Sequence, residues 1–168
     1  RIIRDWDEYD EDEDLGDEEE FEEKEEVEEE TEEEEADEPI SEEEAQERIL
    51  EMESDYPEGM DWTNDNYYQR GNYTGRGCIG FAYLVQDEVF GKDSKSEKYR
   101  DFDPDHLHIG DHIRLYNDEG SEHSVIILDI FDDEVELVEG NYNSSIHWGR
   151  TMSFDEMESN FIYGETRY

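Results

Sequence analysis

Apolar and polar positions alternate along three segments in the second half of the chain, at 112–116, 124–131 and 134–138. This period of two predicts strands that bury one face. Only Asp132 and Asp133 separate the last two segments, which predicts an antiparallel hairpin. Shorter segments at 145–150 and 161–168 bring the expected sheet to about five strands.

Two other segments carry apolar side chains at helical spacing. In 42–53, Ala45, Ile49 and Met52 share one face, and Ser41 followed by Glu44 predicts a capping box. In 79–90 a broad apolar face ends at a glycine. A helical turn is expected at 154–158, and 60–77 is expected to be an irregular loop. Residues 92–105 form a polar stretch that leads to the strands. The pattern predicts an α+β fold, with helices packed on an antiparallel sheet.

Charge is distributed unevenly along the 168 residues, which carry a formal net charge of -43. The first 55 residues contain 32 Asp or Glu but only 4 Lys or Arg. So few apolar side chains cannot offset the entropy of ordering, so we expect residues 1–40 to form a disordered acidic tail and 41–168 to form one domain. The tail is most simply a solvated spacer, with recruitment of a basic partner or cations as the alternative.

The acidic composition also excludes classes of partner. Nucleic acid and anionic lipid are bound through Lys and Arg, so neither is expected as a partner. Apolar runs such as 125–128 are far shorter than the roughly 20 residues of a membrane helix, so no membrane insertion is expected. The single cysteine cannot form an intrachain disulfide, and no cofactor is expected.

That cysteine, Cys78, stands at the start of the 79–90 helix between Gly77 and Gly80. A helix N-terminus and a nearby imidazole lower the pKa of a thiol and make it a nucleophile. The glycines allow a substrate carbonyl to approach closely. The Cys78 N–H is free to stabilise an oxyanion, because the first N–H groups of a helix have no intrahelical acceptor.

His123 precedes the most apolar strand and is the expected general base. A hairpin that turns at Asp132 and Asp133 places residues 126 and 139 roughly opposite each other. Glu139 must then reach His123 diagonally, while Asn141 lies nearer. Both remain candidates for the residue that orients the imidazole.

Three landmarks in this order resemble those of NlpC-like and CHAP cysteine peptidases and amidases. They are Gly77-Cys78-Ile79-Gly80-Phe81-Ala82, Ile109-Gly110-Asp111-His112-Ile113-Arg114-Leu115 and His123-Ser124-Val125-Ile126-Ile127. Trp62-Thr63-Asn64-Asp65, Glu139-Gly140-Asn141-Tyr142-Asn143 and His147-Trp148-Gly149-Arg150 are similar to segments of secreted CHAP-like domains of Firmicutes. The resemblance covers about 41–168 and implies a papain-like fold and a Cys78, His123, Glu139 or Asn141 site. It also implies cleavage of peptide or amide bonds of peptidoglycan in the cell wall or outside the cell.

Aromatic residues are candidates for substrate binding, namely Trp62, Tyr68 and Trp148, although core packing is the simpler role for Trp62. His147 and Arg150 are further candidates to line the cleft.

His106, His108 and His112 offer a rival zinc site, with Asp105 or Asp111 as an oxygen ligand. Without a His-Glu-x-x-His helix or paired cysteines, we expect solvated histidines and no metal. The alternative to an enzyme is an inactive CHAP-like binding module.

Overall fold

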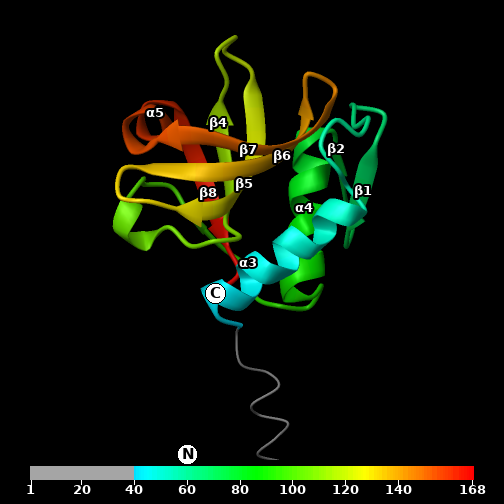
Figure 1. Ribbon diagram of the computed structural model, residues 1–168, viewed down its shortest axis with the longest axis horizontal. Helices are drawn as coiled ribbons and strands as arrows, with labels where there is room; N and C mark the ends of the chain where they lie inside the picture. The colour runs from blue at the N-terminus through cyan, green and yellow to red at the C-terminus, as the bar shows by residue number, and fades with distance from the viewer. Residues whose placement is uncertain (1–39) are drawn as a thin grey trace, which may run out of the picture. The chain divides into compact units, whose positions relative to one another are not determined.

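The computed structural model describes residues 40–168, and Ile40–Tyr168 form one compact unit (Figure 1). The predicted acidic tail therefore lies, except for its last residue, outside the described residues. The helical elements are α3 (Glu42–Glu51), η1 (Met52–Ser54), α4 (Cys78–Phe90), η2 (Pro104–His106) and α5 (Phe154–Asn160). No helix in this part of the chain combines the length and hydrophobicity needed to cross a membrane.

The strands form one antiparallel sheet of six and a separate hairpin. The order in the sheet is β3 (Glu97–Tyr99), β8 (Phe161–Thr166), β4 (His112–Tyr116), β5 (Glu122–Ile130), β6 (Glu134–Tyr142) and β7 (Ser145–Ser153). The hairpin joins β1 (Tyr67–Arg70) to β2 (Tyr73–Arg76). The predicted α+β class, with helices packed on an antiparallel sheet, is confirmed.

The prediction of an irregular loop at 60–77 was wrong, and the polar stretch 92–105 contains a strand that was not predicted. Within 60–77, β1 and β2 pair around a two-residue Gly71-Asn72 turn, in which Gly71 has φ +60°. Their alternate side chains are polar or exposed, so no apolar pattern marks them, although Gly-Asn is a known hairpin signal. Within 92–105, β3 pairs three residues with β8 at the sheet edge, and so short an edge strand leaves no periodic signature.

Alternate residues of β5 face two different apolar cores. Ile126 and Leu128 pack with Phe81 and Val85 of α4 in the first core. Val125 packs with Leu137 and Met157 in the second core. Helices α3 and α4 contact each other, and both contact β5 (Figure 1). Burial of the sheet on both faces explains why β5 is so apolar.

The register around β5 decides which polar side chains meet. In the β4–β5 pair, Arg114 lies opposite Ser124. In the β5–β6 pair, an irregularity between 127 and 129 brings Ile126 opposite Val138 instead of the expected 139. A β-bulge of this kind is invisible to hydrophobic periodicity.

Candidate active site

The turn before α4 holds Cys78 at the first position of the helix. Gly77 has φ +65° and ψ -133°, a combination that favours glycine, and a Cβ there would overlap Asn64 Oδ1. The Gly77 N–H donates to Asn66 O (2.9 Å), and Trp62 Nε1–H donates to Gly77 O (2.8 Å). The backbone that carries Cys78 is therefore fixed from both sides.

His123 and Glu139 complete a linear arrangement with Cys78. The His123 side chain is only 8% exposed, and its Nε2 donates to Glu139 Oε1 (2.9 Å). The same imidazole lies close enough to the Cys78 thiol to lower the pKa of that thiol, and because Nε2 is paired with Glu139, Nδ1 is the nitrogen available to the sulfur. The ring thus bridges the thiol and the carboxylate, the geometry expected of a nucleophile, a base and an orienting group.

The two candidates for the orienting group have different partners. Glu139 is buried and accepts two hydrogen bonds from Arg150, at Oε2 from Nε (2.9 Å) and at Oε1 from Nη2 (2.8 Å). Asn141 has φ +55°, and its Nδ2 donates to Asn64 Oδ1 (3.1 Å). Glu139 therefore contacts the His123 ring, while Asn141 contacts the segment before Cys78.

Electrostatic interactions favour the charged forms of Cys78 and His123, a thiolate and an imidazolium. Burial raises the pKa of Cys78, but the hydrogen bond and positive charge of His123, the Ser124 backbone and Arg114 lower it to about 7. Burial lowers the pKa of His123, but Cys78 and Glu139 raise it to about 9. Because the thiol is the stronger acid, thiolate and imidazolium coexist between these pH values.

Arg114 is a site residue that sequence reasoning missed. Its Nη1 lies 3.6 Å from Cys78 Sγ and 2.9 Å from Ser124 Oγ. One signal could have found it. Arg114 alternates with apolar residues in the predicted strand 112–116, and pairing that strand with the next places Arg114 opposite Ser124, the residue that follows His123. The charge of Arg114 adds to that of His123 at the sulfur.

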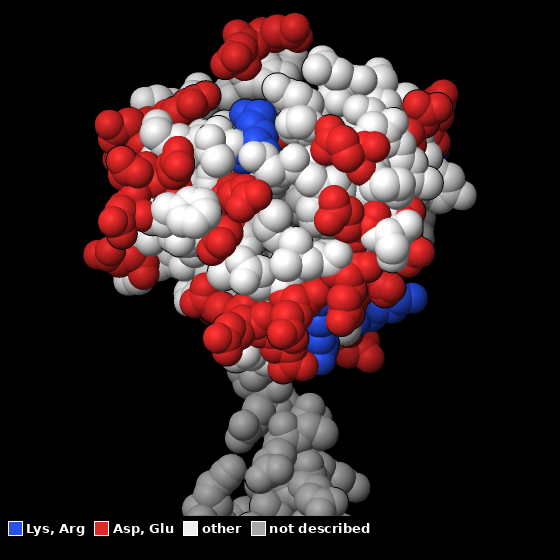
Figure 2. Space-filling view, in the orientation of Figure 1, with Lys and Arg blue, Asp and Glu red and all other residues white. Residues whose placement is uncertain are grey.

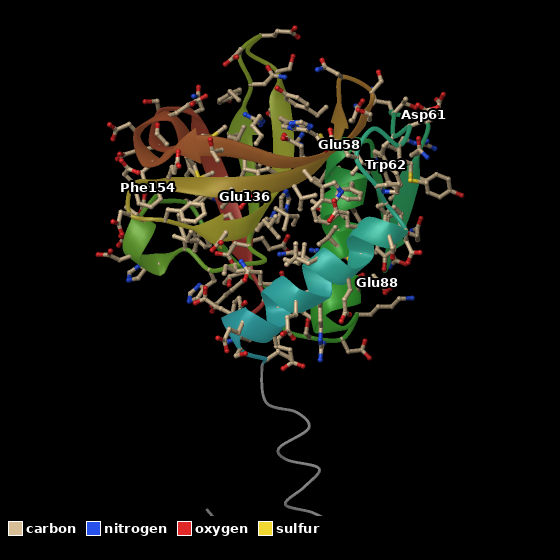
Figure 3. The ribbon with its side chains drawn as sticks, viewed as in Figure 1. Glu58, Asp61, Trp62, Glu88, Glu136 and Phe154 are labelled. Atoms are coloured by element: carbon tan, nitrogen blue, oxygen red, sulfur yellow. The ribbon has the colours of Figure 1, made fainter. Side chains whose placement is uncertain are left out.

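The three predicted aromatic binding residues each have a hydrogen-bond partner other than Cys78 or His123. Trp62 is 6% exposed and packs in the core beside α4 (Figure 3), which agrees with its core-packing alternative. Tyr68 O–H donates to Asp87 (2.9 Å), and Trp148 Nε1–H donates to Tyr56 O (2.8 Å). None of the three contacts Cys78 or His123 through a hydrogen bond.

The four remaining histidines have separate partners. His106 is exposed and lies 3.2 Å from Asp103, while His147 Nδ1 lies 2.7 Å from Glu58. His108 is partly exposed, but His112 is fully buried, so the expectation of a solvated histidine was wrong there. Between residues 40 and 168, no group of three or more His, Cys, Asp or Glu is arranged to hold a metal ion.

A depression of about 340 Å³ adjoins His123 at the end of the sheet. Its lining includes the β4–β5 turn, Asn141, Arg150 and Glu156, but not Cys78. Figure 2 shows acidic side chains around the margins of the visible face and in patches within it, and basic atoms in a hollow of that face. Arg150 is the one Lys or Arg in the lining of the depression, and its guanidinium is paired with Glu139.

Comparison with known proteins gives a fold and no family. No family model matches the chain, and no curated protein matches it. A crystal structure of Ly7917 is similar over 76% of this chain and 62% of that chain, with 11% identity and a TM-score of 0.52. The structure of Ly7917 with the hydrolyzing product of MDP is similar over 76% and 63%, with 12% identity and the same TM-score. The chain thus spans less than two thirds of the length of Ly7917, and the likeness is one of fold.

Proposed function

We propose that residues 40–168 form a cysteine hydrolase that cleaves an amide bond. The observation that carries the proposal is the Cys78, His123 and Glu139 arrangement, in which one imidazole contacts both the thiol and a buried carboxylate. A thiol with a pKa near 7 beside an imidazolium with a pKa near 9 supplies both the nucleophile and the acid that amide cleavage requires.

In the first half of the reaction, the Cys78 thiolate attacks the carbonyl carbon and a C–S bond forms. The Cys78 N–H, at the first position of α4, stabilises the oxyanion. The His123 imidazolium gives its proton to the leaving nitrogen, and the C–N bond breaks to release an amine and leave a thioester.

In the second half, neutral His123 removes a proton from water, which attacks the thioester. The acyl group leaves as a carboxylic acid, and the thiolate and imidazolium are restored. Glu139 holds the Nε2–H of the ring throughout, so that Nδ1 exchanges the proton with sulfur, substrate and water.

We propose a peptidoglycan peptide or amide bond as the substrate. The resemblance of residues 41–168 to CHAP-like domains supports this class. The structure of Ly7917 with the hydrolyzing product of MDP points to the same peptidoglycan-derived class. On this proposal the protein acts in the cell wall or outside the cell.

The test is digestion of purified peptidoglycan and its soluble muropeptides, with products identified by mass spectrometry. We expect each cut to produce one new amine and one new carboxylate, with no new reducing sugar end. Cys78→Ala should abolish these products, with a loss of at least about a thousandfold. Products formed equally by wild type and Cys78→Ala would refute the proposal.

The alternative is a catalytically inactive binding module of the same fold. The opposite pKa shifts of Cys78 and His123 favour the enzyme, because a binding module has no need to place an imidazole beside a thiol and activate it. Binding of intact muropeptides by wild type and Cys78→Ala alike, without any product, would favour the module.

A further inference from the structure

A second cation reaches the Cys78 sulfur from the strand next to that of His123. Arg114 Nη1 lies 3.6 Å from Sγ, and the Arg114 side chain is only 18% exposed. At its outer side, Arg114 Nε and Nη2 face Glu122 Oε1 at 3.3 and 3.2 Å. The guanidinium is therefore clamped between a surface carboxylate and the thiol.

On its inner side, Arg114 is held by a fully buried chain of polar groups. Nη1 donates to Ser124 Oγ (2.9 Å), and Ser124 Oγ lies 2.8 Å from His112 Nε2. Nδ1 of the same ring lies 3.3 Å from Glu165 Oε1. Glu165 also accepts hydrogen bonds from Arg70 and Ser96.

With His112 neutral, one assignment of hydrogens satisfies this chain. Nδ1–H donates to the Glu165 carboxylate, which leaves His112 Nε2 unprotonated. Arginine has no acceptor, so the Ser124 oxygen accepts from Arg114 and its hydroxyl donates to His112 Nε2. Burial lowers the pKa of His112, which agrees with a neutral ring. Each donor in this chain thus has a specific acceptor.

We propose that Arg114 is a second cation that stabilises the Cys78 thiolate, and that Ser124 and His112 are positioning residues that hold it there. Ser124, His112 and Glu165 have the order of a nucleophile, a base and a carboxylate. They are nevertheless between 0% and 2% exposed, and the Ser124 hydroxyl faces a guanidinium instead of a cleft. Their positions are therefore those of residues that hold the Arg114 guanidinium in place.

The contacts of Arg114 are compatible with both the thiolate and the thioester form of Cys78. Charged groups reach Cys78 from β5 as His123 and from β4 as Arg114, with Glu139 and Glu122 behind them. When sulfur becomes a neutral thioester, Arg114 keeps Ser124 and Glu122, so no buried charge loses its partners. The inference rests on the proposed function only in what it says about hydrolysis.

The experiment is the pH dependence of iodoacetamide alkylation of the only cysteine in the chain, with Cys78→Ala as the blank. We expect Arg114→Gln to raise the midpoint and slow alkylation below pH 7 by about three- to tenfold. Arg100→Gln removes the same charge at an exposed arginine and should leave the midpoint unchanged. Circular dichroism of each variant checks the fold.

Two further variants separate charge from position. Arg114→Lys keeps a charge but cannot contact Sγ, Ser124 and Glu122 together, so its midpoint should lie between those of wild type and Arg114→Gln. It also serves as the test where Arg114→Gln does not fold. Ser124→Ala removes no charge, and we expect it to raise the midpoint by loosening Arg114 and to slow alkylation about twofold.

Three outcomes would overturn the inference. Arg114 variants that alkylate with the wild-type midpoint would show that Arg114 does not act on the thiol, and a rise in KM alone would make it a substrate contact. A raised midpoint in Arg114→Gln with an unchanged one in Ser124→Ala would overturn the positioning role of Ser124 and His112. Because alkylation needs no substrate, it measures the effect of Arg114 on the Cys78 thiol even if the wild-type protein hydrolyses nothing.

Discussion

The Cys78 thiol and the His123 imidazole depart from their ordinary acidities in opposite directions. Burial opposes both shifts, yet the contacts between them, with Arg114 and Glu139 alongside, leave the thiol with a pKa of about 7 and the imidazole with one of about 9. On the proposed function, the charged pair is the form that attacks an amide carbonyl and then protonates the leaving amine.

A bell-shaped pH dependence of kcat/KM follows at the residue scale. Below pH 7 the thiol is protonated and does not attack. Above pH 9 the imidazole is neutral and has no proton for the leaving nitrogen. We expect limbs near pH 7 and pH 9 and a maximum near pH 8, measured on a soluble muropeptide. Activity that rises steadily through pH 9 would contradict the role of His123 as an acid.

Glu139→Gln tests the group that orients His123. The neutral amide no longer raises the pKa of His123, so the alkaline limb should move to lower pH and kcat should fall about ten- to a hundredfold. Glu136→Gln is the matched control, because it makes the same change on β6 at a residue with no hydrogen bond to His123 (Figure 3). An equal effect of both variants would remove Glu139 from the mechanism.

Cys78 and His123 could be chosen as candidates from the sequence because each has a local signature, a glycine-flanked helix start and an apolar strand. The sequence could not decide between Glu139 and Asn141, because a β-bulge sets the register and Asn141 takes a left-handed backbone. Arg114 was not identified from the sequence, because a contact between residues of two strands is not visible in either strand alone.

At the scale of elements, the N-terminus of α4 depends on a turn that favours glycine. We expect Gly77→Ala to lower the free energy of unfolding by about 1–3 kcal/mol and to reduce kcat, because φ +65° with ψ -133° is strained and its Cβ overlaps Asn64. Urea unfolding and hydrolysis measure the two effects.

Gly71→Ala is the control for that variant. Gly71 also has positive φ, but a Cβ there meets nothing within 4 Å and the residue lies in the β1–β2 turn. Its cost should be about 1 kcal/mol with unchanged kcat. A Gly77→Ala protein as active as Gly71→Ala would show that the turn does not position the thiol.

Trp62→Phe separates packing from substrate binding. The phenyl ring keeps most of the core contacts but removes one of the two donors to Gly77 O and leaves the Phe81 N–H, so stability should fall by about 0.5–1.5 kcal/mol and kcat should fall with KM unchanged. Trp148→Phe removes a similar bond to Tyr56 O and should leave kcat unchanged. A rise in KM with Trp62→Phe would instead support a groove wall.

Long periodic segments were predictable from the sequence, and short ones were not. α3, α4 and β4 to β6 each bury a repeating face, which the alternation of apolar residues reveals. β1, β2 and β3 have only three or four residues and bury little, so they owe their structure to pairing partners that the local sequence does not display.

At the scale of the whole molecule, charge repulsion opposes folding. Residues 40–168 contain 31 Asp or Glu and 10 Lys or Arg, and Figure 2 shows the acidic excess on one face. Because salt screens repulsion between exposed charges, raising NaCl from about 20 to about 500 mM should raise the urea midpoint of unfolding. A midpoint that falls with NaCl would mean that attractive ion pairs such as Arg150 with Glu139 dominate.

The central claim is that Cys78 forms a covalent bond with the acyl half of its substrate. The most direct measurement is intact-protein mass spectrometry after rapid acid quenching of wild type with excess muropeptide. We expect an added mass equal to the acyl fragment, located on Cys78 by peptide mapping and released by neutral hydroxylamine. Turnover without that adduct, and at the same rate in Cys78→Ala, would contradict the account.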